Sequence, residues 1–237
     1  RGLGVAGFSE LTIVPDAGVV KLDPDIPLDI ACVIGCAVQT GVGAVFNSAR
    51  VEVGSTVFVT GLGGIGISIV QGARIAGAGK IIVSDPVAER REAAIHFGAT
   101  YTINPDEDEV VPKVLEETKA IGVDYAFEAA GVASLVDTCI NASRIGGTTV
   151  IVGADASLST VQILPVLIAT MGKKIIGSLL GDCHPQRDIP NFVNLWKSGQ
   201  LDLEAMISHR VKLEEINSGF QNVRETNGIR TVVEVGA

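Results

Sequence analysis

The chain has 237 residues, of which 47% are hydrophobic and 4% aromatic, and its formal net charge is −9. This length allows one large domain, or one and a half smaller ones, with a substantial buried core. The negative charge argues against DNA or RNA as a partner. No apolar run in the sequence approaches the roughly 20 residues that a membrane-spanning helix needs, so we expect no membrane partner.

The four cysteines form no Cys-x-x-Cys pair, and nothing in the sequence resembles a signal peptide. We therefore expect a reduced, cytoplasmic protein without a disulfide framework. The sequence opens with Arg-Gly-Leu-Gly rather than with Met. We interpret it as a piece of a longer protein.

The first elements in chain order are β-rich. Residues 11–14 and 19–20 are apolar runs separated by a turn at residues 15–18, which predicts strands within residues 8–22. Residues 28–38 are mostly small and apolar and predict a helix.

From Ser55 onward, short apolar runs alternate with glycine turns and helical segments. This alternation is typical of βαβ units and predicts an α/β fold with a doubly wound parallel sheet. The expected strands are residues 56–60, 80–84, 123–127, 148–152 and 174–180, and the first two expected helices are residues 67–76 and 87–97, the second closed by Gly98.

After Gly181 the alternation stops. Residues 189–198 and 213–224 predict amphipathic helices, and residues 230–235 predict a closing strand. This change in pattern indicates that the tail belongs to another domain.

The turn after the first βαβ strand has the pattern G-x-G-x-x-G, formed by Gly61, Gly63, Gly64, Ile65 and Gly66. In a dinucleotide-binding turn, Gly61 allows the tight turn and Gly63 lets the pyrophosphate approach the backbone. Gly66 lets the helix pack closely on the sheet. The N–H groups at the start of the helix then face the phosphates.

Asp85 follows the second strand, 19 residues beyond Gly66. This spacing suits a carboxylate that binds the adenosine ribose hydroxyls, and a carboxylate there repels the 2′-phosphate of NADP. We therefore predict NAD as the cofactor. Arg90 and Arg91 lie just downstream and could favour NADP instead, or could be solvated helix charges.

With these residues in place, the chain resembles zinc-dependent medium-chain alcohol dehydrogenases over nearly its whole length. The resemblance rests on the segments 35–44, 61–66, 83–85, 97–99, 124–131, 150–153 and 228–231. The segment 183–190 is similar to bacterial members of that family.

The resemblance implies a role for several residues. Cys36 matches the third ligand of the catalytic zinc, and Thr40 matches the residue that packs on the nicotinamide and directs hydride transfer. The implied coenzyme contacts are Asp85 and Arg90 for the ribose, Val152, Ser178 and Leu180 for the carboxamide, and Arg230 for the pyrophosphate. Ala129 is a further implied coenzyme contact.

Members of this family use Zn²⁺ as a Lewis acid while a hydride passes from the alcohol to NAD. A catalytic zinc needs three protein ligands. The resemblance places the other ligands upstream of Arg1, and no other Cys or His of this chain matches their positions. We therefore expect this chain alone to bind NAD without catalysing the reaction.

Without the resemblance, the same residues have simpler interpretations. Cys36 is then a small buried residue on an apolar helix, and Arg230 is a charge at the edge of a strand. His184 is adjacent to Cys183, a poor arrangement for a metal pair. His96 falls within a helix and His209 just before a strand. The acidic run 106–109 is then a solvated loop.

Two hypotheses remain. In the first, the chain is part of an NAD-dependent alcohol dehydrogenase that acts on a small alcohol or aldehyde. In the second, it is a non-catalytic dinucleotide-binding module or sensor subunit.

We expect a Rossmann domain at residues 38–180 and remnants of a β-rich, GroES-like catalytic domain at 1–37 and 181–237. The resemblance also implies a homodimer or higher homo-oligomer through the sheet edge at 161–180, and exposed apolar surface on the remnants predicts self-association.

Overall fold

The computed structural model describes residues 5–154 and 159–236. The chain forms two compact units. One comprises Cys36–Cys183, and the other joins Arg1–Gly35 to His184–Ala237. Each unit is described by itself below.

The Cys36–Cys183 unit contains a six-stranded sheet in the order β3-β2-β1-β4-β5-β6, in which every described pair of neighbours is parallel. This arrangement confirms the predicted doubly wound fold. The strands are β1 (Thr56–Thr60), β2 (Lys80–Ser84), β3 (Tyr101–Ile103), β4 (Val123–Glu128), β5 (Ser143–Ile151) and β6 (Lys174–Gly177).

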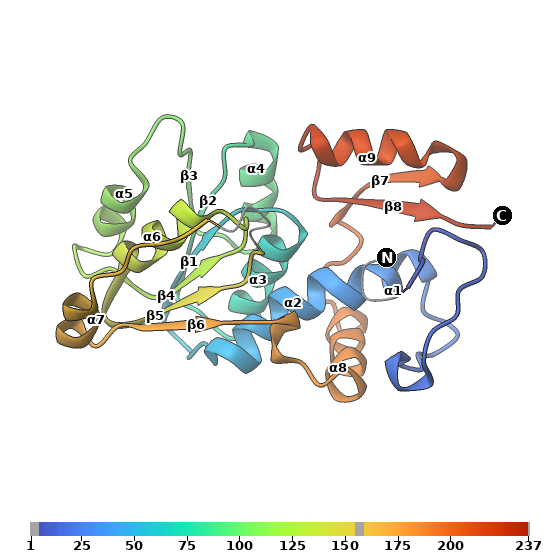
Figure 1. The fold of residues 1–237 in the computed structure, drawn as a ribbon, viewed down its shortest axis with the longest axis horizontal. Helices are drawn as coiled ribbons and strands as arrows, with labels where there is room; N and C mark the ends of the chain where they lie inside the picture. The colour runs from blue at the N-terminus through green and yellow to red at the C-terminus, as the bar shows by residue number, and fades with distance from the viewer. Residues whose placement is uncertain (1–4, 155–158, 237) are drawn as a thin grey trace. The chain divides into compact units, whose positions relative to one another are not determined.

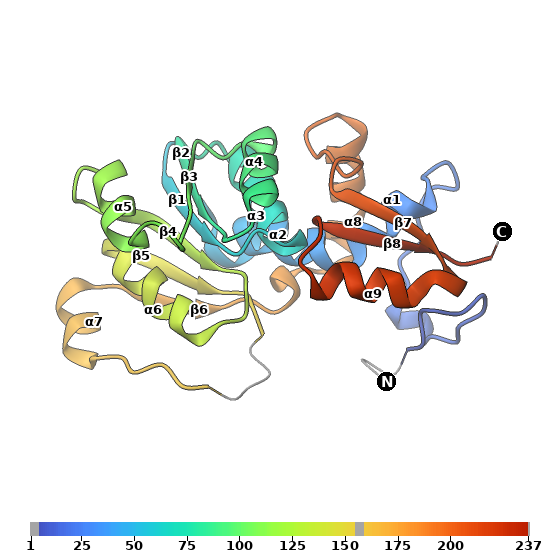
Figure 2. The same cartoon turned by 90° about the horizontal axis from the view of Figure 1, so that it is seen from above.

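Helices cover both faces of this sheet. Figures 1 and 2 show α3 and α4 on one face and α5 and α6 on the other. The helices that follow the strands are α3 (Gly64–Ile75), α4 (Ala88–Phe97), α5 (Val110–Glu117), α6 (Ala133–Ala142) and α7 (Pro165–Met171). Because both faces are covered, the strands read as continuous apolar runs rather than as alternating ones.

The core lies around the central strands β1 and β4. Phe58 and Phe127 are fully buried, and Phe58 packs in a cluster with Ile82, Ile103 and Val114. Full burial of each such side chain contributes roughly 1.5–3 kcal/mol. The buried core therefore fixes the positions of β1 and β4, and with them the carboxyl ends of these two strands.

The predicted helix at residues 28–38 is longer than expected. The structure continues it through α1 (Leu28–Val33), a π-helical segment (Ile34–Val38), α2 (Gln39–Gly43) and a second π-helical segment (Ala44–Ala49). It ends where Arg50 adopts a left-handed conformation, with φ +52°.

This helical run corrects the expectation that no apolar stretch approaches 20 residues. Leu28–Ala49 has 22 residues, and an 18-residue window within it has a mean hydropathy of 1.7, so the run is long and apolar enough to cross a membrane by length and composition alone. Within the structure, however, 67% of the apolar window is buried, and core helices pass the same test. The run is therefore weak evidence for a membrane span.

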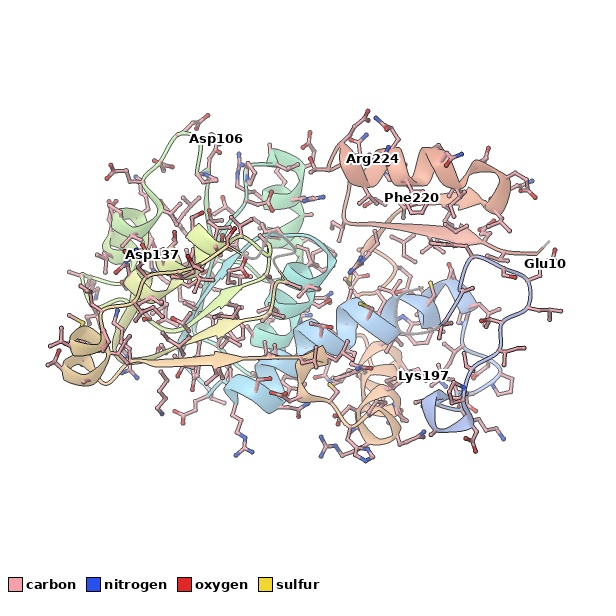
Figure 3. The ribbon with its side chains drawn as sticks, viewed as in Figure 1. Glu10, Asp106, Asp137, Lys197, Phe220 and Arg224 are labelled. Atoms are coloured by element: carbon pink, nitrogen blue, oxygen red, sulfur yellow. The ribbon has the colours of Figure 1, made fainter. Side chains whose placement is uncertain are left out.

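The second unit contains two parallel strands, β7 (Ile207–Lys212) and β8 (Arg230–Glu234). They are joined through a 3-10 turn (Leu213–Glu215) and α9 (Ile216–Arg224), which packs on both strands. α8 (Pro185–Lys197), which carries the Lys197 labelled in Figure 3, precedes them. Lys197 pairs with Asp23 and Asp25, at 3.2 and 3.5 Å. The expected strand at 230–235 and both expected helices are therefore present.

Two expectations for this unit are wrong. Within residues 8–22 the structure has no strand, only a 3-10 turn at Asp16–Gly18, and Leu11 and Ile13 are 88% and 95% exposed. A β-rich run forms a strand only where a partner strand supplies hydrogen bonds. His209 lies inside β7 rather than before a strand.

Candidate coenzyme site

The glycine turn leaves β1 at Gly61, whose φ of +87° is in the left-handed region. A side chain is disfavoured there twice over, because a Cβ atom would also lie 2.8 Å from the Cβ of Ala130. The Gly61 N–H donates to the Ser84 carbonyl at 2.9 Å, which ties the turn to the end of β2. Gly61 therefore has the expected role of allowing the tight turn.

Gly63 is the residue that caps the N-terminus of α3. Its φ of −67° is accessible to any residue, and a Cβ atom added there would meet nothing within 4 Å. The protein itself therefore does not require glycine at this position. The open space lies directly before Gly64 and Ile65, which begin α3 and present the positive end of the helix dipole.

Gly66 has a different role from the expected one. A Cβ atom there would collide with the Gly61 carbonyl oxygen, whereas the nearest atom of β1, Val59 Cγ1, would be 3.8 Å away. Glycine is needed at Gly66 chiefly because the turn folds back onto the first turn of its own helix. Close packing of the helix on the sheet is secondary.

Asp85 follows β2 and is only 4% exposed. Its Oδ2 accepts the Leu62 N–H of the glycine turn at 2.6 Å, and its Oδ1 accepts the Val87 N–H at 2.9 Å. A carboxylate can accept about four hydrogen bonds, so acceptor positions remain on both oxygens. Asp85 thus fixes the glycine turn while keeping the capacity to bind hydroxyls.

The two arginines after Asp85 lie in different surroundings. The Arg91 guanidinium donates to the Asp85 and Pro86 carbonyl oxygens, at 2.6 and 2.8 Å. Arg91 therefore binds the backbone segment just before α4 and is not a solvated helix charge. Arg90 is half-buried on the same helix.

The β4 end carries a buried carboxylate that the sequence analysis missed. Glu128 is 1% exposed, and its Oε1 accepts the N–H groups of Ala130, Gly131 and Val132, at 2.8, 2.8 and 3.3 Å. The signal was an acidic residue at the end of an apolar strand, directly before Ala-Ala-Gly. This contact shapes the loop that contains Ala129.

The remaining predicted coenzyme residues of this unit follow neighbouring strands. Their backbone N–H groups donate to backbone carbonyl oxygens at the strand ends: Ala129 to Thr60 (3.0 Å), Val152 to Glu128 (2.9 Å) and Ser178 to Ile151 (2.9 Å). Because the carboxyl ends of parallel strands meet at one edge, the structure brings these residues to the same edge as the glycine turn and Asp85.

Thr40 lies on α2 and is 5% exposed. Its neighbour Gly41 approaches the start of α3 so closely that a Cβ atom would lie 2.5 Å from both the Ile65 carbonyl oxygen and Ser68 Cβ. The helix that carries Thr40 is therefore packed directly against the first turn of α3, beside the glycine turn.

Cys36 is exposed, which corrects its interpretation as a small buried residue. Among the residues that the structure describes, no three His, Cys, Asp or Glu side chains gather into a group that could hold a metal. Within residues 5–154 and 159–236, the side chains therefore do not fit a zinc ion by themselves. Arg230 begins β8 in the other unit, and its pyrophosphate contact stays a prediction.

The strand order, the glycine turn after β1 and the acid after β2 define a Rossmann-type α/β protein. The family model described as zinc-binding dehydrogenase matches residues 64–198, more than half of the chain. The chain belongs to the zinc-binding dehydrogenase family.

Three comparisons illustrate the similarity. "Alcohol dehydrogenase-like 5" of Arabidopsis thaliana is 40% identical over 234 residues, covering 98% of this chain and 60% of that protein. The benzyl alcohol dehydrogenase structure from Acinetobacter calcoaceticus has a TM-score of 0.87 and 29% identity, over 92% of this chain and 59% of its own. A zinc-binding dehydrogenase of Sinorhizobium meliloti, bound to NADP, has a TM-score of 0.76 and 30% identity, over 84% and 57%. This chain spans about 60% of the length of the curated relatives it matches.

Proposed function

We propose that this chain binds NAD along the carboxyl edge of its parallel sheet and forms the coenzyme-binding part of an NAD-dependent alcohol dehydrogenase. The observation that carries the proposal is Gly63. It is a glycine that neither its backbone conformation nor its neighbours require, at the amino end of a 12-residue helix. A pyrophosphate bound in the open space would explain this glycine, because a side chain at position 63 would occupy the same space.

For the adenosine half, the N–H groups of Gly64 and Ile65 would hold the phosphates, and the remaining acceptor positions of Asp85 would bind the ribose hydroxyls. Since one structural neighbour is bound to NADP, the choice of coenzyme in this chain rests on its own residues. A 2′-phosphate next to the Asp85 carboxylate would place like charges in a buried site, which favours NAD.

For the nicotinamide half, we assign Ala129, Val152, Ser178 and Leu180 to the carboxamide and its ribose. Thr40 would pack on the ring and leave one face open for hydride transfer. Cys36 would supply one ligand to zinc in the longer protein, where the metal acts as a Lewis acid on the alcohol. Small alcohols or aldehydes are the proposed substrates, and this chain alone is expected to show no turnover.

A non-catalytic dinucleotide-binding module is the second candidate. It is favoured by one observation, that no group of three metal-ligand side chains occurs in residues 5–154 and 159–236. Alcohol-dependent NAD reduction by a version extended upstream, but not by this chain, would support the dehydrogenase. If the extended version binds NAD and zinc yet oxidises no alcohol, the module is the better description.

The experiment on this chain measures NADH affinity by fluorescence titration and compares the parent chain with the variant Gly63→Ala. The new methyl group enters the pyrophosphate space, so NADH affinity should fall at least tenfold, about 1.4 kcal/mol. The melting temperature should move by no more than a few degrees, because the position is open and its φ is ordinary.

Gly18→Ala is the matched control, since Gly18 belongs to the other unit and also has open surroundings. It should leave NADH affinity unchanged, and NADPH should bind the unmodified chain at least tenfold more weakly than NADH, about 1.4 kcal/mol. Equal NADH affinity of Gly63→Ala and the parent chain would contradict the assigned site. Preferential binding of NADPH would overturn the choice of NAD.

A further inference from the structure

The segment that follows β6 has an unusual backbone. Leu180, Gly181 and Asp182 are three consecutive residues with positive φ, at +49°, +69° and +47°. Glycine adopts this conformation freely and Asp tolerates it, but for a bulky residue such as Leu it is costly. Such a conformation persists only where the surrounding structure holds it.

Side chains from the π-helical segment Ala44–Ala49 hold this turn. The Ser48 hydroxyl donates to Asp182 Oδ2 at 2.6 Å, and the Ser48 hydroxyl oxygen lies 2.8 Å from the Ser178 hydroxyl oxygen. Asn47 Nδ2 donates to the Gly181 carbonyl oxygen at 3.1 Å. Ser48 therefore connects both ends of the turn, Ser178 and Asp182, to one helix.

The backbones also approach each other closely. A Cβ atom on Gly181 would lie 2.7 Å from Gly43 Cα, and a Cβ atom on Gly43 would lie 2.7 Å from the Gly181 carbonyl oxygen. Gly43 ends α2, the helix that carries Thr40. The turn after β6 is thus docked directly on the helical run that carries the residue assigned to the nicotinamide face (Figure 1).

We propose that Asp182 and Ser48 are positioning residues for the nicotinamide half of the coenzyme. Their hydrogen bond, together with the Ser48–Ser178 contact, holds the left-handed turn in the conformation that presents Ser178 and Leu180 to the carboxamide. The inference rests on the proposed NAD site. Asp182 is exposed and Ser48 half-buried, so their contact adds little burial and acts mainly by fixing orientation.

The test compares two ligands on the same chain, NADH and ADP-ribose, by calorimetry or fluorescence. ADP-ribose carries the adenosine, the pyrophosphate and the second ribose of the coenzyme but no nicotinamide, so it lacks the carboxamide that Ser178 and Leu180 would hold. Ser48→Ala and Asp182→Ala should weaken NADH binding at least fivefold and change ADP-ribose binding less than twofold. A merely structural role would weaken both ligands together.

Matched variants separate the hydrogen bond from the backbone conformation. Ser48→Thr keeps the hydroxyl, and Asp182→Asn keeps an acceptor and tolerates positive φ, so each should restore NADH affinity to within twofold. Asp182→Gly permits the left-handed backbone without an acceptor and should behave like Asp182→Ala.

The outcomes distinguish the two levels of the proposal. If the unmodified chain binds neither NADH nor ADP-ribose, the proposed function itself fails. If it binds both, and the Ser48 and Asp182 variants lose neither or lose both equally, the positioning role is overturned while the coenzyme site stands.

Discussion

At the scale of single residues, Gly66 and Gly63 of the glycine turn differ in whether the protein itself requires glycine at that position. Gly66 is required by the protein, because any Cβ atom would collide with the Gly61 carbonyl oxygen. Gly63 is surrounded by open space, so only a bound molecule would require it. One motif thus combines a structural glycine with a ligand-dependent one.

This contrast gives a prediction for stability. Gly66→Ala should lower the free energy of unfolding by about 1–3 kcal/mol, since the methyl group forces the turn away from α3. Urea denaturation followed by circular dichroism measures the change. Gly63→Ala is the internal control, and equal stability of the two variants would contradict the assignment.

The buried carboxylates Asp85 and Glu128 show how far residue-level inference from sequence reaches. Asp85 could be predicted because its spacing from the glycine turn is diagnostic of a ribose contact. Its bond to the Leu62 N–H could not, since it depends on how the turn folds back over β2. Glu128 was missed because a strand-end acid whose partners are three neighbouring N–H groups has no distinctive spacing.

At the scale of secondary-structure elements, α1 is tied to β7 by one ion pair in the second unit. Arg210 Nη2 donates to Asp29 Oδ2 at 2.7 Å, and this hydrogen bond holds the pKa of the Asp29 carboxyl below its ordinary value of 3.8. Both side chains are partly exposed, at 43% and 30%, so the pair is screened by solvent.

The pair predicts a dependence of stability on pH. Because the pKa of Asp29 is lower in the folded state, the pair stabilises the protein above pH 3.8, and the contribution is lost as the pH falls through the lowered pKa. We expect Asp29→Asn to cost about 0.2–1 kcal/mol at neutral pH and nothing in strong acid.

Urea unfolding of Asp29→Asn and the parent chain at a series of pH values measures this difference. Arg210→Gln is the control and should remove the same pH-dependent contribution. A difference between the two proteins that persists unchanged into strong acid would show that the ion pair is not its source.

The elements that could be predicted are those that the sheet buries on both faces. Thr56–Thr60 and Lys80–Ser84 are continuous apolar runs, and the structure confirms both bounds. β3 was missed because it has three residues. The strand expected after His209 begins earlier, at Ile207, because Ile-Ser-His-Arg-Val-Lys alternates weakly in the middle and does not mark its start. Residues 11–14 were wrongly expected to be a strand because β propensity carries no information about a partner strand.

At the scale of the whole molecule, apolar side chains are exposed near the edge of the parallel sheet. Leu164, Val166 and Leu179 are 64%, 63% and 82% exposed, and within the part of the chain that the structure describes β6 pairs only with β5. An unpaired strand beside exposed apolar side chains favours association between copies.

We therefore predict that the chain forms a dimer through residues 161–180. The double variant Leu164→Lys with Val166→Lys should shift the species seen by sedimentation velocity from dimer to monomer. Val53→Lys alters a side chain of the same unit that is 84% exposed and lies outside this segment, so it should leave the dimer intact. A parent chain that sediments as a monomer would refute the interface.

The strand order also sets the sequence in which the sheet can assemble during synthesis. β1, β2 and β3 are neighbours, so half of the sheet can form once the ribosome has released the residues up to Ile103. β1 then presents an unpaired edge until β4, Val123–Glu128, emerges to cover it. The nascent chain therefore passes through a stage in which the apolar strand β1 is open to other chains, and slow release of residues 103–123 from the ribosome would lengthen that exposure.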